Sequence, residues 1–407
     1  MNAKQLLKLL ILVVVVAAAG ALALWTQARH RQAGAAGVGG RVLPGLDVNQ
    51  VAAVIVTDAD GTVELRKKDG LWRVAQRDDY RADFAGLAAL LRDLAELKAA
   101  RTIEAGPSQF ARLGLAAAAP TPAAGGATEL RLLDAAGKPL AELRLGKEYR
   151  QDGKDAAPNP MGMMGGPGAG GAAGRFLLIP KTGDVLLVAK PLTQVTGRPM
   201  DWVNRDFVKL AEVKRAALAE GGQTLWEISR AQSGDPLKLA GLAKDEQADA
   251  AKLDAVAGAL SWLSFAEIAP KTLKPADAGL DTGKRFTAED FDGTRVTLTI
   301  GKPDHAGRLH LAATVAYAAP KAREAGKDEK PADREKLDAA FAKKQADNQQ
   351  QAADLQERLA DRIFLVEKTA LDGILRGRGE LLAEKPQPEA AANPGAFPMP
   401  PAVPATP

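Results

Sequence analysis

The chain has 407 residues, no cysteine and a formal net charge of +4, which is small for this length. Two domains of ordinary size fit such a length. The lack of cysteine excludes disulfides, thiol catalysis and a lipid-modified cysteine anchor. Lys and Arg are interspersed with Asp and Glu and form no basic stripe, so we predict no nucleic-acid partner.

The N-terminus carries a membrane-anchor pattern. An unbroken apolar run, Leu9–Trp25, follows two lysines. A spanning helix needs roughly 20 apolar residues, with about 17 as the lower limit. We therefore predict a single-pass transmembrane anchor (signal anchor) over residues 1–28. A cleaved signal peptide is the alternative, because Ala21–Ala23 offers a small-x-small cleavage site.

The orientation of this anchor rests on a nearly balanced charge count. Lys4 and Lys8 precede the run, and Arg29, Arg31 and Arg41 follow it. Because a start of this shape resembles an export signal, we predict an inner (cytoplasmic) membrane protein with a periplasmic body. The lipid bilayer is then its first partner. A body that faces the cytosol is the alternative.

A Gly/Ala-rich tether over residues 29–43 leads to a first α+β module, residues 44–212. Apolar, β-branched runs at Val51–Val56, Thr62–Arg66 and Leu71–Val74 are separated by Asp/Gly turns, which predicts an antiparallel meander.

A helix is predicted after the meander. Asp83 is placed to cap it, and four leucines follow at helical spacing, namely Leu87, Leu90, Leu94 and Leu97. A hairpin over Glu129–Leu145 then ends in Gly146-Lys147. The Pro/Met/Gly segment Gln151–Gly174 reads as a flexible loop.

A second module, residues 213–383, repeats these features in the same order. The matches are Leu225–Ile228 with Leu71–Val74, the helical positions Leu253, Val256, Leu260 and Leu263 with the first helix, Ala278–Leu280 with Leu113–Leu115, Gly301-Lys302 with Gly146-Lys147, and Arg362–Val366 with Arg175–Ile179. Five matches in one order predict an internal duplication.

Two further segments have unusual composition. Residues 321–361 are rich in Lys, Glu, Asp, Gln and Ala, which predicts a long solvated helix inserted in the second module. Residues 384–407 are rich in Pro and Ala, which predicts a disordered tail.

Residues with chemical potential are few. His305 and His310 could bind a metal with Asp304, but a five-residue gap does not place two rings on one face of a strand or helix. We predict that they are exposed polar residues around a turn.

Acidic clusters also fit turns better than ligand sites. Glu289, Asp290 and Asp292, like Asp58 and Asp60, lack the full calcium-loop pattern with its distal Glu, and Asp292-Gly293 is ordinary hairpin chemistry.

No phosphate-binding or nucleophile motif is complete. The glycines of Gly162–Gly174 are not followed by Gly-Lys-Ser/Thr, and no Gly-x-Ser-x-Gly element occurs. We predict no catalytic residue, no cofactor-binding residue and no metal ligand, and hence a non-enzymatic protein.

Four tryptophans outside the anchor leave one alternative open. Trp72, Trp202, Trp226 and Trp262 could line a glycan-binding surface. We predict instead that they anchor the cores, because each stands in a different structural element.

Three stretches carry a family resemblance. They are the sequence PGLD at Pro44–Asp47, the turn-Trp unit Gly70–Val74 and the sequence RPMDWVNRDF at Arg198–Phe207. Together with the single N-terminal anchor, they resemble the DUF4340 family of bacterial membrane-anchored proteins, from about Pro44 to Leu382. Members of that family look like companions of ABC-type transport systems of the gliding-motility kind. The resemblance implies an extracytoplasmic accessory role and supplies no catalytic residues.

These features together predict an α+β protein with two tandem copies of a β-meander/helix/hairpin module behind one transmembrane helix. The expected function is a membrane-anchored extracytoplasmic accessory or scaffold protein, with ABC-type transporter subunits as partners. The alternative is an envelope enzyme or glycan-binding module with a site between the two repeats.

Overall fold

The computed structural model describes residues 38–117, 126–150, 174–210, 212–320 and 330–383. The chain divides into two compact units, residues 1–206 with 269–271, and residues 207–268 with 272–407. The predicted anchor, residues 29–37 of the tether, residues 151–173 of the Pro/Met/Gly segment and the Pro/Ala tail lie outside the described residues. Within the described ranges, no helix combines the length and the apolar character that crossing a membrane requires.

The first unit is built on one nine-stranded sheet. Its elements in chain order are β1 (Ala53–Asp58), β2 (Gly61–Lys68), β3 (Leu71–Val74), β4 (Tyr80–Arg81), α2 (Phe84–Ala95), β5 (Ala99–Ile103), α3 (Phe110–Leu113), β6 (Thr128–Leu133), β7 (Pro139–Tyr149), β8 (Gly174–Ile179) and β9 (Asp184–Val188). The strand order is β4-β3-β2-β1-β6-β7-β8-β9-β5, and all paired strands are antiparallel.

Turn chemistry sets the register of the meander. Asp69 and Gly70 both have positive φ, 52° and 77°, as a two-residue hairpin turn between β2 and β3 requires. The strands alternate between buried and more exposed residues, so that Val54, Val56 and Val63 all point into one core. The predicted meander is confirmed.

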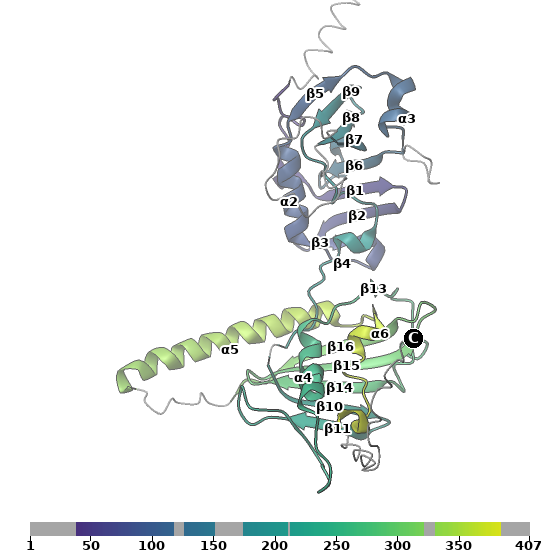
Figure 1. Ribbon diagram of the computed structural model, residues 1–407. Coiled ribbons are helices and arrows are strands. Elements are labelled where there is room, and N and C mark those ends of the chain that lie inside the picture. Colours follow the sequence, from purple (N-terminus) through teal and green to yellow (C-terminus); the bar gives the residue numbers. More distant parts are fainter. Residues whose placement is uncertain (1–37, 118–125, 151–173, 211, 321–329, 384–407) are drawn as a thin grey trace, which may run out of the picture. The chain divides into compact units, whose positions relative to one another are not determined.

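Helix α2 lies along one face of this sheet (Figure 1). The Asp83 side chain accepts hydrogen bonds from the backbone N–H groups of Ala85 and Gly86, which are the unpaired donors of the first helical turn. The four predicted leucines, from Leu87 to Leu97, are buried. Both the predicted cap and the predicted core face of this helix are confirmed.

The second unit is built on an eight-stranded sheet. Its elements are β10 (Val213–Glu220), β11 (Gln223–Ser229), β12 (Lys238–Leu239), α4 (Ala250–Gly258), β13 (Glu267–Ile268), β14 (Lys284–Asp290), β15 (Thr294–Pro303), β16 (Leu309–Tyr317), α5 (Pro331–Leu359), β17 (Phe364–Val366) and α6 (Lys368–Leu371). The strand order is β12-β11-β10-β14-β15-β16-β17-β13, again antiparallel throughout. The protein is therefore α+β, with two antiparallel sheets and few helices.

Aromatic side chains fill part of the second core. The rings of Phe207, Phe265 and Phe364 pack with centroids 4.9 to 5.3 Å apart. Phe207 makes edge-to-face contacts with the other two rings, which are tilted against each other at 49°. Trp226 contacts Phe286 and donates a hydrogen bond from Nε1 to the Arg376 carbonyl oxygen, at 2.8 Å. Trp226 is thus a buried anchor, as predicted.

The charged insertion forms helix α5, which projects beyond its sheet in Figure 1. Its C-terminal half contacts β16, where Gln356 Oε1 accepts a hydrogen bond from Val315 N at 2.6 Å and Leu359 is buried. The described side chains of its first turns are exposed, including Leu337. The prediction of a long solvated helix is confirmed over residues 331–359.

Two of the five sequence matches fall on different strands of their sheets. Trp226 lies in β11, the second strand of its unit, whereas Trp72 lies in the third strand, β3. Phe364 lies in β17, which pairs with β13, whereas Phe176 lies in β8, which pairs with β7 and β9. The sequence analysis missed β16 and β5, and also the two-residue strands β4, β12 and β13.

Candidate functional site

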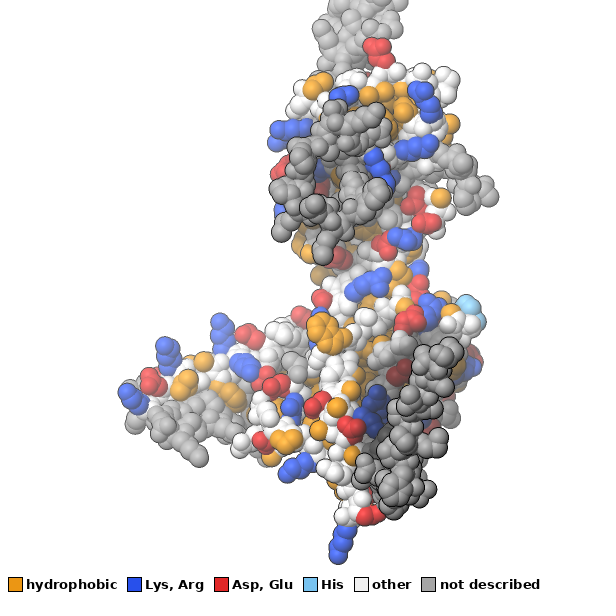
Figure 2. All heavy atoms as spheres, in the orientation of Figure 1, with side chains coloured by type: hydrophobic (Ala, Val, Ile, Leu, Met, Phe, Trp, Pro, Cys, Tyr) orange, Lys and Arg blue, Asp and Glu red, His pale blue; other side chains and the backbone are white. Residues whose placement is uncertain are grey.

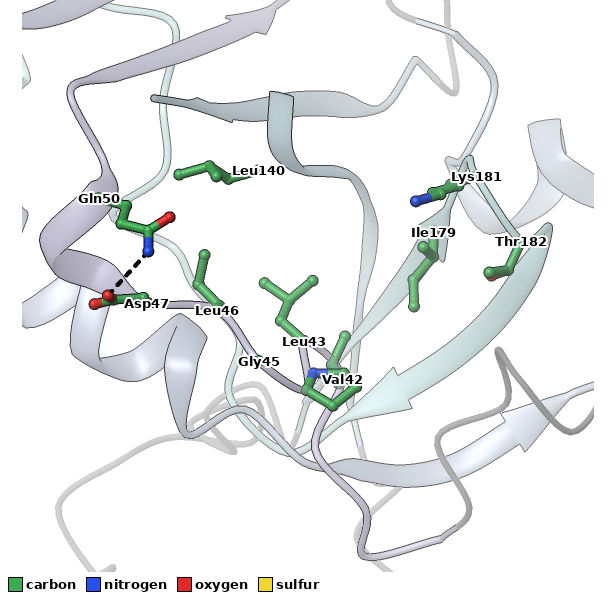
Figure 3. A pocket seen from close by; sticks show the side chains of 11 residues that line it. Val42, Leu43, Gly45, Leu46, Asp47, Gln50, Leu140, Ile179, Lys181 and Thr182 are labelled. Atoms are coloured by element: carbon green, nitrogen blue, oxygen red, sulfur yellow. Dashed lines mark hydrogen bonds between the residues drawn. The ribbon is translucent and has the colours of Figure 1, made fainter. Parts of the chain in front are cut away.

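A pocket of about 310 Å³ opens in the first unit, beside the segment through which the chain enters the fold (Figure 3). Its lining residues are Val42, Leu43, Pro44, Gly45, Leu46, Asp47, Gln50, Leu140, Ile179, Lys181 and Thr182. One wall therefore contains the PGLD sequence that carries the family resemblance. The other walls are the start of β7 and the turn after β8.

The PGLD wall is shaped by a tight turn. Gly45 has φ +85°, and the Leu46 N–H donates to the Leu43 carbonyl oxygen at 3.3 Å. Pro followed by a residue with positive φ is the signature of a type II turn. The turn brings the side chains of Leu43 and Leu46 to the same pocket, where Figure 3 shows both pointing inward.

Asp47 of the same sequence caps the short 3-10 helix Val48–Gln50. Its Oδ1 accepts from the Asn49 backbone N–H at 2.9 Å, and its Oδ2 accepts from Gln50 Nε2 at 3.3 Å. The carboxylate of Asp47 therefore acts as the N-cap of this short helix.

The opposite wall comes from the hairpin turn between β8 and β9. Gly183, with φ +78°, donates to the Ile179 carbonyl oxygen at 2.9 Å, and the Thr182 hydroxyl donates to Asp184 at 2.6 Å. The Lys181 side chain is exposed and points over the pocket in Figure 3. Among the residues that the structure describes, no carboxylate pairs with its ammonium group. Sequence reasoning missed Lys181, although the neighbouring pair Thr182-Gly183 was a usable turn signal.

The Trp202 segment closes the edge of the first unit. Trp202 is buried and donates from Nε1 to the Thr196 carbonyl oxygen at 2.9 Å, while its own carbonyl oxygen accepts from the Asp83 N–H. Gly197 N–H donates to Asp58 Oδ2 at 2.7 Å. A Cβ atom on Gly197 would lie 2.3 Å from the Gly61 carbonyl oxygen, so only glycine fits there. These contacts attach the Trp202 segment to β1 and to Asp83, the N-cap residue of α2.

The acidic clusters occupy turns, as predicted. Asp58 Oδ1 accepts from Asp60 N at 2.8 Å within the β1–β2 turn. Asp290 Oδ1 accepts from Thr294 N across the β14–β15 turn, and burial raises the pKa of the Asp290 carboxyl despite that hydrogen bond. In the described parts of the chain, no three His, Cys, Asp or Glu side chains are grouped closely enough to hold a metal ion.

The two histidines do not behave alike. His310 lies within β16 and is buried, with Nδ1 2.7 Å from the Lys302 carbonyl oxygen. The prediction that both histidines are exposed around a turn is therefore wrong for His310. Its neighbours in the sequence, Leu309 and Leu311, are buried as well, so the chain is covered on both faces at this point.

One tryptophan contradicts the prediction of a core role. Trp72, Trp202 and Trp226 are buried, whereas Trp262 has a relative exposure of 88%. Trp262 follows the short 3-10 helix Ala259–Ser261, while Leu260 and Leu263 on either side of it are buried. It lies nine residues after the buried Leu253, which is about half a turn out of phase in a helix. That periodicity was the signal that could have placed it outside.

The fold defines a class of α+β protein in which each of the two units carries one antiparallel sheet. The family model DUF4340, described as a domain of unknown function, matches residues 72–156. The match confirms the resemblance of this chain to the DUF4340 family over that stretch. The comparison with curated proteins finds no match, and neither does the comparison with solved structures.

Proposed function

We propose that the chain is a non-enzymatic, membrane-anchored extracytoplasmic accessory or scaffold protein of an ABC-type transport system or envelope assembly. The observation that carries this proposal is the exposure of Trp262 on a segment whose neighbouring apolar residues are buried. Tryptophan is enriched among the residues that dominate protein–protein binding energies. The apolar run Leu9–Trp25 supports attachment to the inner membrane with a periplasmic body.

The proposal includes an internal duplication of one α+β module, which the sheet topology supports. Without β4, the first sheet has the order β3-β2-β1-β6-β7-β8-β9-β5, and the second has β12-β11-β10-β14-β15-β16-β17-β13. When these strands of each unit are numbered in chain order, the two sheets have the same strand order. In each unit a helix, α2 or α4, precedes the edge strand, β5 or β13.

A matching local contact supports the same proposal. The pairing of β7 shifts register after Leu145, next to Gly146-Lys147, and the pairing of β15 shifts after Ile300, next to Gly301-Lys302. A Cβ on Gly146 would lie 2.4 Å from the carbonyl oxygen of Leu113.

The counterpart of this contact in the second unit has nearly the same dimensions. A Cβ on Gly301 would lie 2.2 Å from the carbonyl oxygen of Ala278. The glycines that follow these carbonyl residues, Gly114 and Gly279, have φ +69° and +71°. On this correspondence, the 151–173 segment and the α5 insertion interrupt different hairpins, β7–β8 and β16–β17.

The test of the scaffold function is crosslinking of the full-length protein in native membranes, with mass spectrometry of the recovered partners. We expect subunits of an ABC-type transporter, and we expect Trp262→Ala to reduce their yield. Leu242→Ala is the matched control, because Leu242 is an exposed apolar residue of the same unit. If Trp262→Ala leaves the yield of transporter subunits unchanged, Trp262 does not contribute to their binding, and the proposal is contradicted.

A glycan-binding module is the second candidate, and Trp262 is again the residue that favours it, because an exposed aromatic ring can stack on a sugar. The form of this alternative in which Trp202 and Trp226 line one open cleft is not supported, since both are buried and each packs within its own unit. Binding of the full-length protein to peptidoglycan fragments, abolished by Trp262→Ala, would favour this candidate over the scaffold.

A further inference from the structure

The pocket beside PGLD combines an apolar interior with a lysine at its mouth that has no partner among the described residues. Leu43, Leu46, Leu140 and Ile179 supply the apolar interior, and Lys181 supplies the cation. We propose that this pocket binds a single-chain anionic lipid, a fatty-acid carboxylate, with its acyl chain on the leucines and its head group at Lys181.

The apolar part of the pocket suits an acyl chain. Leu43, Leu46, Leu140 and Ile179 are each partly exposed, so a bound chain would remove further apolar surface from water. The volume of about 310 Å³ lies at the lower end of the roughly 300–1,000 Å³ of small-molecule pockets. A space of this size favours one chain over the two chains of a phospholipid.

The charges fix which end of the ligand goes where. Lys181 has no partner among the described residues, so its ammonium group is available to a carboxylate. Asp47 lies on the other side of the pocket in Figure 3, and its negative charge would repel an anionic head group placed there. The head group is therefore expected at the β8–β9 turn.

The path of the chain indicates the source of the lipid, and this step rests on the membrane anchor of the proposed function. Sixteen residues separate Trp25, the end of the apolar run, from Val42 in the pocket wall. Even when fully extended, a chain of that length spans at most about 53–58 Å. With the anchor of the proposed function in the membrane, the pocket therefore lies within that distance of the bilayer, which is the source of the lipid in this proposal.

The test is photocrosslinking of the full-length chain with a dodecanoate that carries a diazirine on its chain, followed by peptide mapping. The methyl ester of the same probe serves as the uncharged arm, and butyrate serves as the anion without a chain. We expect adducts on residues 42–50, 140 and 179–182, competition by unlabelled dodecanoate, weaker labelling by the ester and no competition by butyrate.

Two charge-reversal variants separate a site from general attraction. Lys181→Glu should lower the labelling of these peptides by about five- to tenfold, because it removes one solvent-exposed ion pair and adds a repulsion between like charges. Lys67→Glu is the matched control, because Lys67 is an exposed lysine of the same unit outside the pocket. It should leave the labelling unchanged.

Three outcomes would overturn the proposal: adducts only outside these peptides, equal effects of the two charge reversals, or displacement of the probe by an apolar peptide but not by dodecanoate. The last would assign the pocket to a protein segment. In a separate measurement, the fraction of the chain that incorporates into lipid nanodiscs reports on the anchor alone. Labelling is measured in detergent as well, so failure of the anchor and failure of the pocket are distinguishable.

Discussion

Substitution by alanine of Gly146 in the first unit and Gly301 in the second tests the close approach of a strand to a backbone carbonyl oxygen that occurs in both units. Each glycine lies at a register shift where the strand passes against a backbone carbonyl oxygen, that of Leu113 in the first unit and that of Ala278 in the second. We expect both Gly146→Ala and Gly301→Ala to destabilise the unit that contains them.

The magnitude follows from the distances. The added Cβ would stand 2.4 Å and 2.2 Å from these oxygens, and it would also approach side-chain atoms of Leu115 at 2.9 Å and Leu280 at 3.1 Å. Ordinary van der Waals contact begins near 3.4 Å, so the backbone must move by about an ångström. Overpacking of this kind typically costs about 1–3 kcal/mol, and we expect the upper half of that range because backbone atoms must shift.

The assay is hydrogen exchange with mass spectrometry across a urea series, because it reports the unfolding of each unit separately. Gly106→Ala and Gly258→Ala are the controls, one in each unit. A Cβ at either position meets nothing within 4 Å, and neither glycine has positive φ. Gly258 ends helix α4, so alanine should be neutral there or stabilise by up to about 1 kcal/mol.

The packing argument is refuted if both Gly146→Ala and Gly301→Ala unfold at the same urea concentration as their controls. A large loss in one unit with none in the other would retain the packing argument for that unit. It would also count against the proposed equivalence of the two contacts.

Three further predictions concern single side chains. Arg175→Lys should lower the free energy of unfolding in urea by about 1–3 kcal/mol. The part-buried guanidinium donates hydrogen bonds to the carbonyl oxygens of Gly146 and Leu192, and the single ammonium group of a lysine cannot reproduce this two-pronged geometry. Unchanged stability would contradict this prediction. Burial acts to raise the pKa of the Asp79 carboxyl, but hydrogen bonds and charges from Arg66 and Lys68 outweigh burial, so the pKa is lower than usual. The ionised carboxylate therefore stabilises the fold above the ordinary pKa of Asp, and this stabilisation is lost as the pH falls through the lowered pKa. Asp79→Asn should therefore cost up to about 1 kcal/mol at pH 7, since these exposed pairs are screened by solvent, and the difference from the wild type should shrink below pH 4. Trp262→Ala should change the free energy of unfolding by less than about 0.5 kcal/mol, whereas Trp226→Ala should lower it by about 3–5 kcal/mol, because only Trp226 is buried. Similar losses in the two variants would contradict this difference in exposure.

Local signals in the sequence predicted most of the first unit. Asp69-Gly70 specifies its turn because both residues accept positive φ, and Asp83 caps its helix because its side chain can reach two backbone N–H groups. These features depend on residues close together in the chain. They could be predicted without knowledge of the rest of the fold.

Features that depend on distant partners could not be predicted in the same way. His310 is buried in β16, which is an interior strand paired with β15 and with β17, and β17 follows only after the long α5 insertion. The alternating apolar pattern of β16 was visible in the sequence, but the charged segment that follows obscured the hairpin. For the same reason Arg362–Val366 was matched with β8, whereas the proposed duplication pairs it with β9.

The candidate pocket shows the same limit more clearly. PGLD was recognised as a family feature, and its turn and cap could be read from Pro44, Gly45 and Asp47. Nothing in the sequence placed Lys181, more than 130 residues later, at the same pocket. That proximity follows from the order of the strands, which brings the β8–β9 turn beside the entry of the chain.

The measurement that tests the central claim most directly is protease accessibility on sealed spheroplasts, combined with recovery of the full-length protein from the same membranes in a gentle detergent. The proposed function predicts that added protease cleaves the body from outside, and that the intact protein is recovered with ABC-type transporter subunits. A body that is cleaved only after the membrane is opened would contradict the extracytoplasmic location. A body that is accessible but recovered alone would contradict the scaffold function.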